Sequence, residues 1–237
     1  MVDDDKLPTE KKPDAVGDFL AKVAAAPRPV SGAAQGRLLF ALDATASRQP
    51  TWDHAAQLQG EMFMAARDIG GLAVQLAFYR GFGEFKASKW LMDPSRLANM
   101  MSTVTCLAGE TQIEKVLRHA LDETAKVKVN AVIFVGDACE ENVDRLGRAA
   151  GELGLKGVPV FVFHEGDDPV AAFAFDQIAK LSGGAAVRFD RSSADALKRL
   201  LGAVAVFAAG GQAALEAHAG KMGGDVLALT HALKKGR

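Results

Sequence analysis

Residues 130–163, NAVIFVGDACEENVDRLGRAAGELGLKGVPVFVF, decide the fold class of this chain. Two short apolar runs, Asn130–Gly136 and Val158–Phe163, are rich in Val and Phe, which is typical of strands buried on both faces. The stretch between them repeats apolar residues at helical spacing, at Val143, Leu146, Ala150 and Leu153. A strand, a helix and a second strand in this order predict a βαβ unit, in which the two strands run parallel.

The same alternation extends to both sides of this unit. Further apolar runs predict strands at Arg37–Leu42, Leu72–Tyr79 and Ala185–Phe189, and a shorter run, Phe85–Leu91, predicts an edge strand. Helical stripes lie between these runs, at Asp53–Arg67, at Thr111–Lys126, around Ile178 and Leu181, and at Leu197–Val204. We therefore expect an α/β protein with a doubly wound, mostly parallel sheet that carries helices on both faces.

The sequence pattern divides the chain into three parts. Residues 1–30 mix charges and prolines and predict a mobile leader with one helix at Asp18–Ala25. Residues 36–208 carry the alternating pattern and predict the folded domain. Residues 209–237 predict a helical extension that either packs on the domain or docks onto a partner. Its apolar residues fall roughly on one face, at Leu215, Met222, Val226, Leu229 and Leu233.

Composition excludes several classes of protein. The chain has 28 basic and 29 acidic residues, and this balance argues against nucleic acid or an anionic membrane as the partner. Two cysteines cannot form a disulfide-dense scaffold. No segment reaches the roughly 18 apolar residues that a membrane span requires. The acidic start, Met1–Lys6, differs from a secretory signal, so we expect a cytoplasmic protein.

Oxygen-bearing side chains follow the predicted strands where a parallel sheet binds its ligands. Asp43, Thr45 and Ser47 alternate after the first strand, Asp137 follows Gly136, and Thr111 precedes a predicted helix. Two carboxylates and three hydroxyls form an all-oxygen donor set, which suits Mg²⁺ or Mn²⁺. Because only two of these donors carry charge, a bound ion stays electrophilic and accepts a carboxylate from outside. The pattern favours a docking site over a sealed structural ion.

These residues resemble the metal-ion-dependent adhesion site of the von Willebrand factor type A (VWA) family. The matching segments are Asp43-Ala-Thr45-Ala-Ser47, Thr111 in Gly-Glu-Thr-Gln-Ile, and Asp137 in Val-Gly-Asp-Ala. The resemblance covers residues 37–208 and implies a doubly wound, Rossmann-like sheet with one antiparallel edge strand. It implies that Thr45, Ser47 and Thr111 ligate the metal through hydroxyls, and that Asp43 and Asp137 bind it directly or through water.

Two positions depart from the family pattern. Gly136-Asp137-Ala138 stands where the family usually has Thr-Asp-Gly, and Glu110 replaces a frequent glycine before the threonine. Neither departure removes a ligand. Single residues also have simpler interpretations, because Thr45 and Ser47 are typical of turns or caps, and Thr111 with Glu114 is typical of a helix N-cap.

Other side chains offer weaker candidates. Cys106 and Cys139 lie on the same predicted edge, where we expect inert, partly buried thiols. His164, Glu165, Asp167 and Asp168 follow a strand and are expected to cap the next helix and to line a solvated loop. The sequence has no phosphate-binding loop, dinucleotide fingerprint or nucleophile elbow, and its other histidines lack metal-ligand spacing.

Three functions remain open from the sequence. The first is a non-enzymatic module in which the ion captures a Glu or Asp side chain of a protein partner. The resemblance implies a bacterial intracellular domain whose partner belongs to an ATPase-linked or metal-insertion assembly. The second is a Mg²⁺-dependent phosphohydrolase of the haloacid-dehalogenase type with Asp43 as nucleophile, although Thr45 stands where such enzymes carry a second Asp. The third is a metal-free scaffold that binds through its C-terminal helix.

Overall fold

The computed structural model describes residues 15–26, 36–51, 72–189 and 194–222. Their strands form one six-stranded sheet in the order β3-β2-β1-β4-β5-β6. All neighbouring strands pair in parallel except β3, which is antiparallel to β2. The strands are β1 (Gly36–Asp43), β2 (Leu72–Arg80), β3 (Glu84–Ala87), β4 (Ala131–Gly136), β5 (Val160–Glu165) and β6 (Ala185–Phe189).

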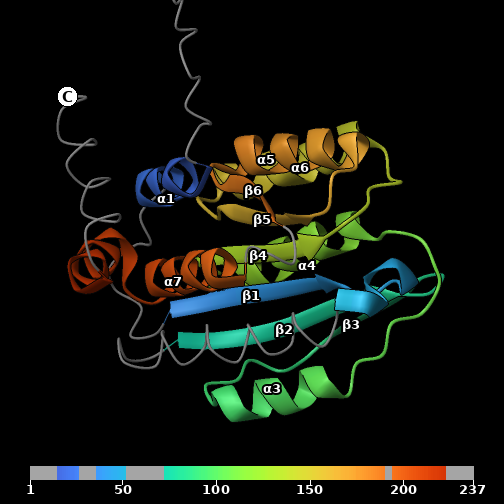
Figure 1. Cartoon of the computed structure of the whole chain (residues 1–237), viewed down its shortest axis with the longest axis horizontal. Coiled ribbons are helices and arrows are strands. Elements are labelled where there is room, and N and C mark those ends of the chain that lie inside the picture. The colour runs from blue at the N-terminus through green and yellow to red at the C-terminus, as the bar shows by residue number, and fades with distance from the viewer. Residues whose placement is uncertain (1–14, 27–35, 52–71, 190–193, 223–237) are drawn as a thin grey trace, which may run out of the picture.

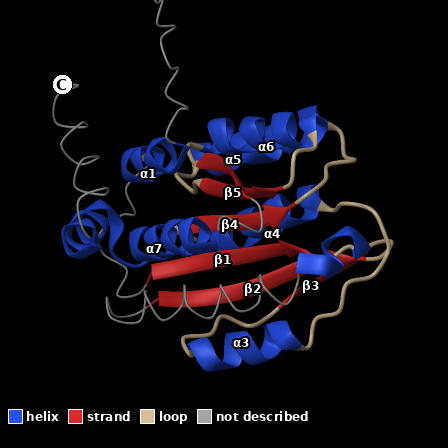
Figure 2. Cartoon of the chain, viewed as in Figure 1, coloured by secondary structure: helices blue, strands red, loops and turns tan. Residues whose placement is uncertain are grey.

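Helices cover both faces of this sheet (Figures 1 and 2). The helices α4, α5 and α6 pack on one face, and α1, α3 and α7 pack on the other. The bounds are α1 (Ala15–Ala25), η1 (Ala46–Thr51, a 3₁₀ helix), α3 (Pro94–Ser102), α4 (Ile113–Lys126), α5 (Val143–Leu155), α6 (Pro169–Ser182) and α7 (Ala194–Met222). The predicted fold class, including the antiparallel edge strand, is confirmed.

The core consists of two clusters separated by the sheet. Successive strand residues point to opposite faces, so that Phe40 packs with α1 and α7 whereas Leu39 packs with α4 and α5. Both residues are fully buried, as is nearly every residue of β1, β4 and β5. Burial on both faces explains why these strands are continuous apolar runs in the sequence.

The edge of the sheet differs in detail from the prediction. The strand predicted at Phe85–Leu91 is β3, Glu84–Ala87, and Leu91 forms only an isolated bridge to Val74. The helix α3 was not predicted. It begins at Pro94 after Asp93, whose carboxylate accepts the Ser95 amide as a cap. The helix predicted at Asp53–Arg67 lies outside the described residues.

Packed helices extend into both of the parts that were predicted to flank the domain. The helix α1 lies within the predicted leader, but Phe19 is 1% exposed and contacts the rings of Phe161 and Phe163. This part of the leader therefore belongs to the core. The helix α7 continues past residue 208 to Met222, with a non-helical Gly211 at φ 68°. Its residue Leu215 is buried, so the start of the predicted extension packs on the domain. None of the described helices is both long and apolar enough to cross a bilayer.

Candidate functional site

Two carboxylates lie beyond neighbouring strands at the switch point of the sheet. Asp43 ends β1 and Asp137 follows β4, and these two strands pair in parallel. A Cβ atom added to Gly136 would lie 3.6 Å from Asp43 Cβ, so the two strand ends approach closely. The remaining strands extend away from this point on both sides, β2 beside β1 and β5 beside β4 (Figure 1). Open α/β sheets bind their ligands at such a point.

The loop that carries Thr111 is fastened to both of these strand ends. The Leu107 amide donates to the Ala44 carbonyl oxygen at 3.0 Å. The Thr111 amide donates to a Glu140 carboxylate oxygen at 3.1 Å, and Thr111 Oγ1 accepts the Glu140 amide at 3.0 Å. These bonds hold three segments together that are far apart in the sequence.

Asp43 is fully buried and has two hydrogen-bonded oxygens. Its Oδ1 accepts the Thr45 amide at 2.7 Å, and its Oδ2 accepts the Tyr79 hydroxyl at 2.8 Å. Burial raises the pKa of Asp43, and the bonds from Thr45 and Tyr79 oppose that rise. Burial and the Asp43 charge together hold the pKa of Tyr79 well above its ordinary value.

Tyr79 was not among the site residues predicted from the sequence. Tyr79 lies directly opposite Asp43 in the register of β1 and β2. Its place at the end of a predicted strand was readable, but the pairing register depends on tertiary structure.

Thr45 and Ser47 hold their hydroxyl oxygens 3.1 Å apart. Thr45 is buried and Ser47 is exposed. The Arg48 amide donates to the Thr45 carbonyl oxygen at 3.1 Å, which closes the first turn of η1. This turn brings the hydroxyl groups of Thr45 and Ser47 close together.

Asp137 carries an acceptor without a partner. Its Oδ1 is buried and has no hydrogen-bond partner among the described residues. A buried carboxylate oxygen in this state is costly and requires an explanation such as a bound cation. The described part of the chain holds no group of three or more His, Cys, Asp or Glu side chains suited to a metal. An ion at this edge would therefore depend on two carboxylates together with hydroxyls.

The interpretation of Thr111 as a helix cap is wrong. Helix α4 has Gln112 at its N-cap, with no side-chain cap bond. Instead, the Glu141 carboxylate accepts the amides of Ile113 and Glu114, the second at 3.0 Å. A carboxylate at a helix N-terminus is stabilised by unpaired N–H groups and by the helix dipole. Glu141 can take this position because the loop after β4 passes over the start of α4.

The acidic residues after β5 have separate roles. Asp168 caps α6 and accepts the Ala171 amide at 2.7 Å, as predicted. Glu165 was predicted to line a solvated loop, but it forms an ion pair with Arg48. His164 is 1% exposed, so it does not line a solvated loop, and burial lowers its pKa.

Both cysteines are free thiols. Burial raises the pKa of Cys106 to about 11 and also raises that of Cys139. A raised thiol pKa reduces the reactive thiolate at neutral pH, which favours the expected inert role.

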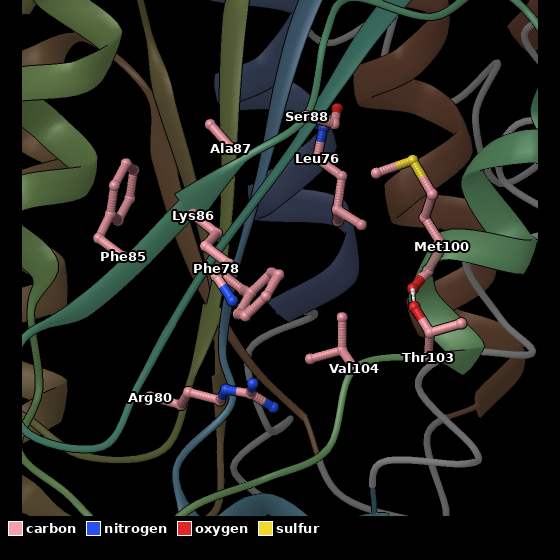
Figure 3. Close-up of a pocket in the computed structure, with 10 residues that line it drawn as sticks. All are labelled: Leu76, Phe78, Arg80, Phe85, Lys86, Ala87, Ser88, Met100, Thr103 and Val104. Carbon is pink, nitrogen blue, oxygen red and sulfur yellow. Dashed lines mark hydrogen bonds between the residues drawn. The ribbon is translucent and has the colours of Figure 1, made fainter.

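A separate cavity of about 570 Å³ lies between β2, β3 and α3. Figure 3 shows Leu76, Phe78 and Met100 around this space, with Arg80 at one end. Arg80 is bonded to Glu84 and to Thr105, so its charge is already balanced. The cavity was not predicted from the sequence, because its lining comes from segments that are separated along the chain.

No protein-family model and no curated protein matches the sequence. Solved structures match its fold. The SpRpn10 VWA domain is 13% identical with a TM-score of 0.56, over 70% of this chain and 94% of that one. The fold is that of a VWA domain.

Two further structures carry the same likeness. An aerotolerance-related membrane protein from Bacteroides fragilis is 16% identical with a TM-score of 0.55, over 70% of this chain and 98% of its own. A von Willebrand factor type A protein from Catenulispora acidiphila is 16% identical with a TM-score of 0.58, over 73% of this chain and 43% of its own. At sequence identities of 13% and 16%, the structural likeness establishes the VWA fold alone.

Proposed function

We propose that this chain is a metal-dependent protein-interaction module. A divalent ion, Mg²⁺ or Mn²⁺, would bind at the switch point of the sheet and capture a Glu or Asp side chain of a protein partner. The observation that carries this proposal is the buried, unpartnered Oδ1 of Asp137 beside Asp43. A cation is the simplest group that satisfies such an oxygen.

The donor set fits a hard divalent ion. Neighbouring ligands of an octahedral Mg²⁺ site with bonds of about 2.1 Å are about 3.0 Å apart. The hydroxyl oxygens of Thr45 and Ser47 are 3.1 Å apart. Thr111 Oγ1 accepts one hydrogen bond and keeps a second lone pair. When bound, the ion would supply an electrophilic centre for an external carboxylate. The residues that would hold it are Asp43, Thr45, Ser47, Thr111 and Asp137.

The surface around this edge suits a protein partner. Phe82 lies in the turn after β2 and is 82% exposed, and Leu107 is 45% exposed beside Thr45. Exposed apolar side chains next to a polar site are typical of binding surfaces. We expect the partner to present an acidic side chain next to apolar residues. Its membership of an ATPase-linked assembly remains an expectation from the family resemblance.

A phosphohydrolase is the less favoured alternative. Both Asp43 oxygens are hydrogen-bonded and the side chain is fully buried, which does not suit a nucleophile that must meet a substrate. An enzyme of this type would hydrolyse p-nitrophenyl phosphate, and Asp43→Asn would abolish the turnover. We expect no turnover from either protein.

Calorimetry on the metal-free full chain tests the proposal. Mn²⁺ is titrated in the presence of a short peptide with one Glu, or of the same peptide with Gln instead. We expect tighter Mn²⁺ binding with the Glu peptide, and loss of binding in Thr111→Ala. Thr103→Ala removes an exposed hydroxyl outside the site and should bind as wild type does. Equal binding with both peptides, or no binding with either, would overturn the proposal.

The metal-free scaffold alternative predicts that partner binding depends on the C-terminal extension and not on the metal. Deletion of residues 223–237 would abolish partner binding if the C-terminal extension carried the function. Under our proposal the deletion leaves Mn²⁺ and Glu-peptide binding unchanged.

A further inference from the structure

Arg48 is the largest fully buried side chain among the described residues. It directly follows Ser47 in η1, and its guanidinium pairs with the Glu165 carboxylate at the end of β5. Burial of a guanidinium costs several kcal/mol unless nearby charges compensate it. The buried charge of Arg48 therefore requires compensation by carboxylates that lie near it.

The sheet order places this guanidinium over the carboxyl end of β4. Strand β4 lies between β1 and β5, and neighbouring strands are about 4.8 Å apart. A side chain that starts after β1 and ends at β5 must cross the end of β4, where Asp137 follows. Burial lowers the pKa of Arg48, while the charges of Asp137 and then Asp43 oppose that decrease. Both carboxylates thus lie close enough to stabilise the guanidinium charge.

We propose that Arg48 is a resident counter-cation that partly offsets the charges of Asp43 and Asp137 in the metal-free protein and competes with the divalent ion for them. The metal part of this inference rests on the proposed function, whereas the charge pairing does not. The carboxylates of Asp43, Asp137 and Glu165 with one guanidinium leave two net negative charges. Addition of a divalent ion makes this cluster neutral.

The bound ion and Arg48 repel each other, because both are positive and both interact with Asp43 and Asp137. Arg48 therefore weakens binding of the metal at this site.

Mn²⁺ titration of Arg48→Met in the absence of peptide tests the competition. Met keeps much of the length of the side chain and removes the charge, so we expect Mn²⁺ binding about tenfold tighter than in wild type. Arg145→Met removes an exposed arginine of α5, changes the net charge equally, and should bind as wild type does. Arg48→Lys keeps a cation and should also stay near the wild-type affinity. Equal or weaker binding by Arg48→Met would overturn the competition.

Thermal unfolding in chelator tests the charge pairing without any metal. Arg48→Met is expected to lower Tm because it leaves buried carboxylates without a counter-ion. Asp137→Asn should then raise the Tm of Arg48→Met, but lower that of wild type. Equal Tm shifts in both backgrounds would overturn the pairing with Asp137. If no variant binds Mn²⁺ even with the Glu peptide, the proposed function fails, and this cycle still decides the role of Arg48.

Discussion

Asp43 illustrates how one residue depends on neighbours that are distant in sequence. Its carboxylate is fully buried, and the Tyr79 hydroxyl from the adjacent strand donates to its Oδ2. Tyr79 is itself fully buried, so neither group can exchange this bond for one to water. A buried carboxylate that loses a donor bears a desolvation cost. The Tyr79 hydroxyl therefore supports both stability and the orientation of Asp43.

Tyr79→Phe should lower the free energy of unfolding by about 1.5–3 kcal/mol, because a hydrogen bond to a charged group is lost in the interior. Urea unfolding in chelator measures this difference. Thr103→Ala removes an exposed hydroxyl bonded to the Met100 carbonyl oxygen and should change stability by less than about 0.5 kcal/mol. Equal effects of the two variants would show that the Tyr79–Asp43 bond contributes little.

The loop before α4 owes its position to a close contact between two backbones. A Cβ atom on Gly109 would lie 2.0 Å from the Gly81 carbonyl oxygen, which leaves no room for any side chain. The Glu110 amide donates to the same oxygen at 3.3 Å, and the Gln112 side chain donates to it as well. The turn after β2 therefore sets where Thr111 lies.

Gly109→Ala should destabilise the fold by about 1–3 kcal/mol and weaken Mn²⁺ binding, because the loop must shift away from Gly81. Gly151→Ala is the matched control, since a Cβ atom there meets nothing within 4 Å and α5 favours Ala over Gly. The control should gain about 0.5–1 kcal/mol. Urea unfolding and calorimetry check both changes. Wild-type Mn²⁺ binding by Gly109→Ala would contradict this account of the loop.

The whole domain includes more of the chain than its sheet and crossover helices. Helix α1 packs against α7 and β6, and the Phe19 ring contacts the rings of Phe161 and Phe163 in β5. Gly36 at the start of β1 allows α7 to approach, since a Cβ atom there would be 2.2 Å from the Ala208 carbonyl oxygen. The N-terminal helix thus completes the cluster that covers one face of the sheet.

Phe19→Ala should lower the free energy of unfolding by about 3–5 kcal/mol, as expected for a phenylalanine removed from a packed core. Phe173→Ala in α6 removes a ring that is 58% exposed and should cost less than about 1 kcal/mol. Urea unfolding of the full chain compares the two. If Phe19→Ala changed the free energy of unfolding only slightly, α1 would be loosely attached to the domain, as the predicted leader was.

Strands and helices were predicted correctly where the local sequence pattern agrees with the burial of the element. The runs at β1, β4 and β5 are apolar throughout because both of their faces are covered, and α4 and α5 show clear helical stripes. Prediction was poorer for β3, a short edge strand with exposed residues, and for α3, a nine-residue helix that packs on the core through Leu97 and Met101. Burial of Phe19 was not readable either, because it depends on which surface α1 meets.

The sequence by itself determined the order of strands and helices, the fold class, and which oxygen side chains follow the strand ends. These properties follow from periodicity and residue type, which act over a few neighbouring residues. Only the tertiary structure decided the partners of those side chains: Tyr79 with Asp43, Glu140 with Thr111, and Arg48 with Glu165. Each of these pairs joins residues at least 29 positions apart, so strand register and loop packing bring them together.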